Sequence, residues 1–363
     1  MHQNKGPVYY GDYLQLDQLL NTQKPKSREN GQECHDETLF IIVHQVYELW
    51  FKQILHELDS SLSILKRPHI EEPELVLINS RFERIKKIQS LLLDQLNVIE
   101  TMTPMDFLEF RDLLIPASGF QSVQFREIEI KLGLSEGHRA PMDRDFFIGR
   151  LSTGDQNKIK NISLEDSLFD LTQKWLERIP FTHSHNFNFK NEYFNTVIEI
   201  LGEEKRLIDE NMANLSVNQL KLQLENHLLT EQTFQSLLHI EQHQLLIQSG
   251  ERRLSHQATL SALFILLYRD EPILTAPFSY LTSLMDIDQN FTTWRHRHAL
   301  MAQRMLGTKI GTGGSSGHAY LKRAADNNRI FNDLFNLSTF LIPRSKLPKL
   351  PHELKQQLQF GKR

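Results

Sequence analysis

The spacing of apolar residues constrains the fold of this chain more than any other feature. Over long segments these residues recur every three to four positions, which places them along one face of a helix. We find no convincing set of alternating apolar and polar residues, the pattern of a strand. The sequence therefore predicts an all-α, bundle-like fold with negligible sheet. The predicted helices span residues 39–65, 75–100, 106–114, 164–177, 193–211, 215–249, 257–268, 277–306 and 325–339.

Loop signals and composition predict one large domain over residues 1–363. Glycine, proline and small polar residues gather at 21–31, 133–145, 180–190, 307–317 and 343–351. Residues 201–253 carry many Glu, Gln, Lys and Arg side chains around a thin leucine stripe, as expected of a helical pair that projects from the main body. We interpret 201–253 as a helical insertion, and we find no linker or regular repeat elsewhere.

Composition and charge narrow the functional class. The chain has 363 residues, of which 40% are hydrophobic, so it can bury a large core. Its single cysteine, Cys34, cannot form an internal disulfide, and the first residues lack the apolar run of a signal peptide or membrane span. The net charge of −4 comes from interspersed charges and offers no basic field for nucleic acid or membrane. We expect a cytoplasmic protein that acts on small molecules.

A histidine lies in the first long predicted helix. The 16 histidines are more than an ordinary chain carries, and imidazole commonly binds haem iron, zinc or copper, although composition alone identifies no ligand. His44 follows the apolar run 39–43 and shares a helix face with Phe40, four residues earlier. His44 should therefore lie in a low-dielectric setting and need a partner. It is either a hydrogen-bonded core histidine or a residue of a binding site.

Two histidines lie close together near the end of the predicted helix 277–306. His296 and His298 are two residues apart, so their side chains point about 200° apart on a helix and cannot face one pocket. Phe, Trp and Met residues surround His298 at helical spacing, and Trp294 is one of them. His298 on this apolar face suits a haem-iron ligand, because porphyrin is a large apolar plate. The alternative is core packing with a backbone hydrogen bond.

An aromatic ring and a guanidinium are paired on the predicted helix 106–114. Phe107 and Arg111 are four residues apart, so they share one face. The ring can pack on an aromatic substrate while the arginine binds a carboxylate with two charge-assisted bonds. The alternative is a surface arginine paired with a neighbouring acid.

A glycine-rich segment follows the helix 277–306. Residues 311–317 read GTGGSSG and are predicted to form a mobile loop that either closes over a pocket or is a plain connector. The segment lacks the Gly-Lys-Ser/Thr of a phosphate-binding P-loop.

Other candidate chemistry finds little support. His239 and His243 have helical i, i+4 spacing but lack the order of a zinc protease, so we expect them on the surface. His183 and His185 lie in a predicted turn. Cys34 has no adjacent base, and the chain has no Gly-x-Ser-x-Gly nucleophile elbow, so hydrolase chemistry is not indicated.

Several segments together resemble the tryptophan 2,3-dioxygenase family. They occur in order from about Tyr10 to Pro343 and include YGDYLQL (10–16), HQVYELWFKQIL (44–55), PASGFQSVQFR (116–126), LTSLMDID (281–288) and GTGGSSG (311–317). The resemblance implies a dioxygenase that inserts O₂ across the indole C2–C3 bond of L-tryptophan and forms N-formyl-L-kynurenine, the first step of tryptophan breakdown by the kynurenine route. It also implies one haem b per subunit, ferrous in the active form.

The resemblance also assigns roles to residues. It implies that His298 is the axial ligand of the haem iron and that His44 is the distal histidine, which orients the indole N–H. Arg111 would hold the substrate carboxylate and Thr312 would contact its ammonium group, while Phe40 and Phe107 would flank the indole. The remaining residues that it implies are Ile41, Ile42 and Val43 at the substrate, and Trp294, Ser118 and Gly119 at the haem.

The family resemblance further implies an oligomer. Residues 1–30 match the amino-terminal segment that reaches a neighbouring subunit, where Tyr10, Tyr13 and Leu14 would complete the partner's substrate pocket. A homotetramer, built as a dimer of dimers, is expected. Two places depart from the family pattern: Val43 stands before His44 where many relatives have threonine, and His318-Ala319-Tyr320 replaces a more usual Tyr-x-Tyr. These departures leave loop closure and substrate affinity open.

Three rival interpretations remain at the level of sequence. An indoleamine dioxygenase would accept a broader range of substrates, but the set formed by Phe107, Arg111 and Thr312 argues against it. A haem-binding sensor or carrier would keep the fold without turnover. A helical scaffold without a cofactor is the third.

Overall fold

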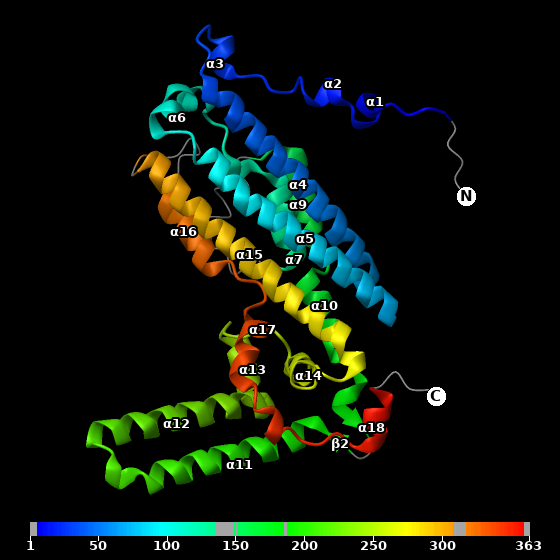
Figure 1. The fold of residues 1–363 in the computed structure, drawn as a ribbon, viewed down its shortest axis with the longest axis vertical. Coiled ribbons are helices and arrows are strands. Elements are labelled where there is room, and N and C mark those ends of the chain that lie inside the picture. The colour runs from blue at the N-terminus through cyan, green and yellow to red at the C-terminus, as the bar shows by residue number, and fades with distance from the viewer. Residues whose placement is uncertain are drawn as a thin grey trace.

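Helices dominate the computed structural model, which describes residues 6–134, 149, 151–184, 187–307, 309 and 317–358. Three long helices, α4 (His35–Leu65), α5 (Glu72–Ile99) and α15 (Thr275–Leu306), pack side by side in the main body (Figure 1). Helix α16 (Gly317–Asn327) lies along α15, and α7 (Val123–Leu132) packs against α4. The predicted all-α fold is confirmed.

The long helices pack through their apolar stripes. Leu58 of α4, Ile78 and Phe82 of α5 and Ile287 of α15 are completely buried at the shared core. Burying one such side chain contributes about 1.5–3 kcal/mol, so the three helices hold one another in register. A capping box formed by Glu71 and Glu74 satisfies free amides at the start of α5. This rigid set of helices provides the walls of the cavity described below.

The remaining helices are shorter, and some of them extend beyond the body. Near the amino terminus and along the body these are α1 (Tyr10–Leu14), α2 (Leu16–Leu19), α3 (Lys26–Glu29), α6 (Pro104–Arg111), α9 (Thr153–Ile162) and α10 (Leu168–Glu177). In the second half they are α11 (Phe189–Glu210), α12 (Val217–Leu238), α13 (Ile240–Gln248), α14 (His256–Leu267), α17 (Asn332–Asn336) and α18 (His352–Gln357).

Strand is confined, within the described residues, to one small hairpin. Strands β1 (His183–Ser184) and β2 (Phe187–Asn188) pair antiparallel, with His183 opposite Asn188. The prediction of negligible sheet is therefore confirmed.

Several helices differ from the sequence prediction. The stretch predicted as one helix over 215–249 is divided at His239, which ends α12 and precedes α13. Helices α7 and α9 were missed, as were most of α16 and the short helices α1, α2, α3 and α18. The stretch predicted as one helix over 325–339 contains the end of α16, then α17 and a 3₁₀ turn. In α7 the charged residues Glu127 and Glu129 are buried because they pair with basic side chains, so its inner face does not look apolar in the sequence. Helix assignment from periodicity fails where ion pairs replace apolar contacts.

A helical hairpin and an amino-terminal arm extend away from the body (Figure 1). The hairpin consists of α11 and α12, and α13 then packs against α14. The arm contains α1 and α2, in which no residue is buried. The apolar side chains of the arm are therefore not buried against the rest of the same chain.

Local signals fix the helices nearest the cavity. Thr103 caps α6 by accepting a hydrogen bond from the Asp106 amide, while Asp106 bonds back to the Thr103 amide. Gly133 ends α7 with a φ of 113°, and a Cβ there would lie 2.5 Å from the Cβ of Phe169. Glycine is needed at this position for both reasons.

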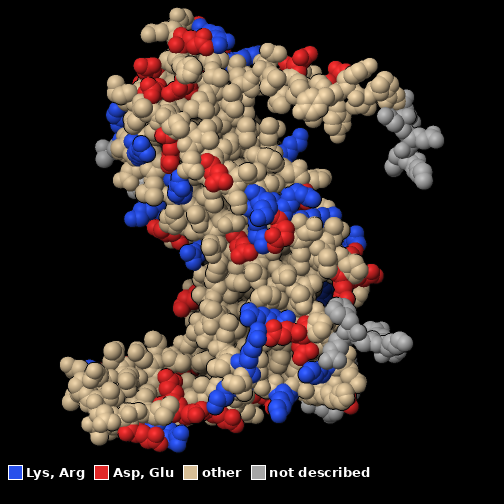
Figure 2. Space-filling view, viewed as in Figure 1, with Lys and Arg blue, Asp and Glu red and all other residues tan. Residues whose placement is uncertain are grey.

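The surface carries mixed charge on the face shown in Figure 2, where basic and acidic side chains alternate without a broad field of one sign. Among the described residues, no helix combines the length and the apolar character needed to cross a membrane.

Candidate functional site

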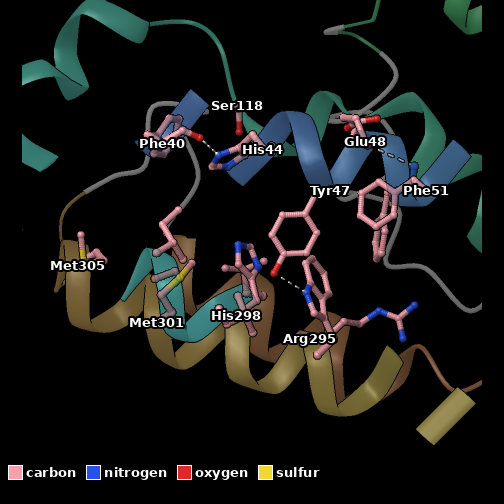
Figure 3. Close-up of a pocket in the computed structure, with 18 of the residues that line it drawn as sticks. Phe40, His44, Tyr47, Glu48, Phe51, Ser118, Arg295, His298, Met301 and Met305 are labelled. Atoms are coloured by element: carbon pink, nitrogen blue, oxygen red, sulfur yellow. Dashed lines mark hydrogen bonds between the residues drawn. The ribbon is translucent and has the colours of Figure 1, made fainter. Parts of the chain in front are cut away.

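A cavity of about 300 Å³ opens between α4, α5, α6, α7 and α15 (Figure 3). Its lining is mainly apolar and aromatic, with a small number of charged and hydroxyl groups, which is the usual composition of a cofactor or substrate pocket. Helix α4 contributes Phe40, His44, Tyr47, Glu48 and Phe51. Helix α15 contributes Trp294, Arg295, His298, Met301, Ala302 and Met305.

His298 presents a neutral imidazole to the cavity. Its ring stacks almost parallel on Trp294, with 5.0 Å between ring centroids and an angle of 10°. Burial among apolar groups, together with the nearby charge of His44, lowers the pKa of His298 to about 4. The ring is therefore unprotonated at neutral pH and has a lone pair that can bind a metal ion.

His296 lies outside the cavity, as the two-residue spacing predicts. Its side chain is 47% exposed and lies 3.8 Å from the carboxylate of Asp326. The helical geometry thus separates the two neighbouring histidines, and only His298 lines the cavity.

His44 faces the cavity from the opposite wall, on α4 (Figure 3). Its Nδ1 donates a hydrogen bond to the carbonyl oxygen of Phe40 at 2.7 Å. Burial lowers the pKa of His44, although the Phe40 carbonyl and the charge of Glu48 act in the opposite direction. In the resulting neutral tautomer the proton is on Nδ1, so Nε2 carries the lone pair and can accept a hydrogen bond from a ligand.

Aromatic rings and an arginine form one part of the cavity. Phe40 stacks on Phe107 with 5.7 Å between centroids, and Phe110 packs edge-on against both. One turn beyond Phe107, the side chain of Arg111 is only 13% exposed and lies 3.7 Å from the carboxylate of Asp112. This part of the cavity can hold a flat aromatic ring and a carboxylate at the same time.

A buried ion-pair cluster also lines the cavity. Glu129 of α7 accepts a hydrogen bond from Arg126 at 2.6 Å and one from Arg295 at 2.8 Å. Arg295 also donates to the carbonyl oxygen of Asn328 at 3.1 Å. These bonds join α7 to α15 and to the segment after α16. Removal of one member would leave a buried charge uncompensated, which typically costs about 3–5 kcal/mol.

Some residues implied by the family resemblance lie elsewhere. Val43 is 3% exposed and lies in the core, whereas Ile42 is 42% exposed. Ile41, Ile42 and Val43 are not among the residues that line the cavity. Thr312 lies outside the described residues. By contrast, Ser118 and Gly119 line the same cavity as His44 and Arg111.

The amino-terminal candidates are far from the cavity of their own chain. Tyr10 and Tyr13 are 75% and 74% exposed, and Leu14 is 40% exposed, on the arm that extends from the body (Figure 1). Within one chain, these three residues contribute nothing to the site.

The prediction that His243 is a surface residue was wrong, whereas His239 is exposed. His243 is completely buried: its Nε2 donates to the Leu254 carbonyl at 2.9 Å and its Nδ1 accepts from Arg252 at 2.9 Å. His239 has an extended backbone at the end of α12 and the start of α13, so it and His243 do not lie on one continuous helix as the sequence suggested. Among the described residues no three His, Cys, Asp or Glu side chains gather as a metal site would require.

Sequence reasoning missed several lining residues. Tyr47 and Phe51 lie three and seven positions after His44, so helical spacing alone could have found them. Phe125, Arg126 and Glu129 could not be found in this way, because no apolar stripe in the sequence predicts α7.

The residues around the cavity fit a haem. His298 offers a neutral imidazole on one wall, and apolar and aromatic side chains suited to a flat macrocycle cover much of the rest. His44 remains on the other wall, where its Nε2 can contact a small ligand. Charged groups are present to bind the polar ends of a cofactor or substrate.

Comparisons with known proteins point to one family. The family model described as tryptophan 2,3-dioxygenase matches residues 1–341. The chain is similar to proteins named tryptophan 2,3-dioxygenase from Bdellovibrio bacteriovorus, at 50% identity over 98% of this chain and 98% of the relative, and from Alteromonas mediterranea, at 46% identity over 99% of both. The protein of that name from Dictyostelium discoideum is 44% identical over 98% of this chain and 88% of its own.

Proposed function

This chain belongs to the tryptophan 2,3-dioxygenase family, and we propose on that premise which of its residues carry out the reaction. The enzyme inserts both atoms of O₂ across the indole C2–C3 bond of L-tryptophan and gives N-formyl-L-kynurenine, with haem as cofactor. The observation that supports the assignment of residues is the position of His298 and His44 on opposite walls of one cavity that Arg111 also lines.

His298 holds the haem iron in this proposal. Its low pKa keeps the ring neutral, so no proton competes with the metal for the lone pair at neutral pH. Trp294, Ser118 and Gly119, which line the same cavity, would contact the cofactor. When bound, the haem supplies the redox chemistry that activates O₂. The protein contributes ligand, orientation and a cavity with few polar groups.

The substrate is oriented by groups from α4 and α6. Phe40 and Phe107 pack on the indole, and the Arg111 guanidinium donates two hydrogen bonds to the carboxylate. Nε2 of His44 accepts the indole N–H, because its other ring nitrogen is committed to the Phe40 carbonyl. Thr312 contacts the ammonium group, a role that rests on the resemblance alone. Together these contacts hold the C2–C3 bond in one position, which is the main way a protein accelerates such a step.

The assembly and location are also proposals. We place residues 1–363 in one dioxygenase domain with a helical insertion over 201–253 and assign the exposed arm to a neighbouring subunit's pocket, within a homotetramer. Exposed tyrosines on an extended arm support this arrangement, since a monomer leaves them in water. The cytoplasm suits a chain with one cysteine.

A substrate comparison tests the proposed function. Reduced, haem-loaded protein is mixed with L-tryptophan in air, and N-formylkynurenine is followed by its near-ultraviolet absorbance. We expect rapid product formation from L-tryptophan and much slower reaction of D-tryptophan and tryptamine, because Arg111 binds a carboxylate in one orientation.

Two other outcomes would contradict the proposal. Similar rates for all three compounds would indicate an indoleamine dioxygenase. A normal ferrous haem spectrum without any product would indicate a haem sensor or carrier.

A further inference from the structure

Trp294 links the axial histidine to the rest of the helical body. Its indole stacks on the His298 ring, one turn away on α15, with centroids 5.0 Å apart and only 10° between the planes. On its other sides the indole contacts Phe125, at 5.1 Å, and Tyr47, at 6.0 Å. Trp294 is thus held from three directions, and one of those contacts is the proposed iron ligand.

A hydrogen-bond chain fixes the position of that indole. Trp294 Nε1 donates to the hydroxyl of Tyr47 at 3.4 Å, and the same hydroxyl donates to the carbonyl oxygen of Leu92 at 2.7 Å. Tyr47 is 8% exposed, and burial raises its pKa to about 12, so the hydroxyl keeps its proton at neutral pH. This hydrogen-bond chain runs from α15 to α4 to α5, the three long helices of the body. Figure 3 marks the bond to the Tyr47 hydroxyl with a dashed line.

His298 has no comparable restraint of its own. Among the described residues, no group forms a hydrogen bond with either nitrogen of its ring. Histidines that bind metals are usually oriented by a hydrogen bond from the second ring nitrogen. Here the parallel face of Trp294 is the contact that restricts rotation of the imidazole.

We propose that Tyr47 and Trp294 act as a positioning pair that fixes the orientation of the His298 ring and so tunes its bond to the haem iron. This inference rests on the proposed function, in which His298 is the axial ligand. Ring orientation changes the strength of the bond between imidazole and iron, and residues behind a metal ligand commonly tune affinity and potential in this way. Tyr47 acts on the His298 ring through Trp294.

Spectroscopy of conservative variants tests the positioning pair. In Tyr47→Phe both aromatic rings remain while the Trp294 indole loses its acceptor. We expect the iron–histidine stretching band of the reduced protein to broaden and move to lower frequency, with a shifted midpoint potential. Transfer of haem to an acceptor protein should become about fivefold faster, the ratio that corresponds to one neutral hydrogen bond.

A double-variant comparison assigns the effect to the hydrogen bond. Trp294→Phe removes the indole N–H donor and replaces the stacked indole with a smaller ring. It should therefore shift the iron–histidine band further than Tyr47→Phe does. Tyr47→Phe should add nothing in the Trp294→Phe background, because the bond is already lost. The matched control is Tyr280→Phe, which removes a completely buried hydroxyl on the same helix, bonded to Thr172 at 2.7 Å and remote from the cavity lining.

The results separate this inference from the proposed function. A Tyr47→Phe protein with the unsubstituted band, potential and haem-transfer rate would overturn the positioning pair, and so would an equal shift in Tyr280→Phe. The unsubstituted protein would still form product in either case. Absence of haem binding or of product in the unsubstituted protein would instead count against the proposed function.

Discussion

The two histidines of the cavity differ in what their rings contact, and the difference suits them to different tasks. His298 stacks on Trp294, and among the described residues nothing forms a hydrogen bond with either nitrogen of its ring. His44 has its Nδ1 bonded to the Phe40 carbonyl, which fixes the position of the Nε2 lone pair. One ring can bind a metal, and the other can accept a hydrogen bond.

Substitution of His44 tests its orienting role. His44→Ala should lower kcat/KM for L-tryptophan by about tenfold, since one or two hydrogen-bond equivalents are lost, while haem content stays normal. Steady-state kinetics and the Soret absorbance measure both quantities. If His44→Ala abolished turnover as completely as His298→Ala with haem still bound, an orienting role would be untenable.

Arg111 is expected to act on substrate binding. Arg111→Ala should raise KM for L-tryptophan on the order of 100-fold or more, because two charge-assisted bonds to the carboxylate are lost, each worth about 1.5–3 kcal/mol. Arg111→Lys keeps the charge without the planar fork, so its KM should lie between those of the unsubstituted protein and Arg111→Ala. The haem spectrum is the control for folding. An unchanged KM in Arg111→Ala would show that Arg111 does not bind the substrate carboxylate.

At the level of single residues, helical spacing correctly predicted which candidate side chains share a face. The 200° between His296 and His298 put one side chain in water and the other in the cavity, and the i, i+4 pairs of Phe40 with His44 and Phe107 with Arg111 share faces. Spacing failed at His243, because the chain leaves the helix at His239. A local backbone break is decided by tertiary contacts that periodicity does not contain.

Among the elements, long apolar stripes were predicted well and ion-paired helices were not. The helices α4, α5 and α15 each begin within four residues of the predicted start, since more than seven turns of apolar spacing leave little ambiguity. Helix α7 was missed because its inward face carries Arg126 and Glu129, which pair with each other, and Glu129 also pairs with Arg295, 166 positions away in the sequence.

The junction between the helical hairpin and the body should be sensitive to acid. His243 and His256 lie 5.3 Å apart between α13 and α14, and burial is the main cause that lowers the pKa of each below its ordinary value of 6.5. Above that value neither the folded nor the unfolded state binds these protons. As the pH falls below 6.5, these histidines become protonated in the unfolded chain before they do in the folded chain, so the folded state loses stability.

Thermal unfolding between about pH 7.5 and about pH 5.5 measures this loss. His243→Gln can keep the bonds to Leu254 and Arg252 without a titrating group, so its midpoint should fall less with acid than that of the unsubstituted protein. His239→Gln, at the exposed helix break, is the matched control and should behave like the unsubstituted protein. An identical decline in all three would show that His243 does not contribute.

For the whole molecule, the amino-terminal arm is the feature that one chain cannot explain. Its tyrosines are exposed while the cavity of the same chain lies elsewhere (Figure 1). If the arm completes a neighbour's pocket, a Tyr13→Ala subunit and an Arg111→Ala subunit should complement each other. One pocket of each mixed dimer then combines an intact arm with an intact arginine, which predicts about a quarter of full activity in a random mixture.

Co-expression with two different affinity tags isolates the mixed assemblies, and L-tryptophan turnover is the readout. Each variant alone should be nearly inactive at low substrate. If the purified mixed assemblies were no more active than the separate variants, the arm would serve its own chain or none.

The central claim is that His298 holds the haem iron, and a comparison with its exposed neighbour tests it most directly. His298→Ala and His296→Ala are each loaded with haem, reduced and mixed with L-tryptophan, while the Soret band and N-formylkynurenine are followed. We predict an unsubstituted spectrum and normal product formation for His296→Ala, and loss of the histidine-ligated ferrous spectrum and of product for His298→Ala. A normal spectrum and turnover in His298→Ala would contradict the account.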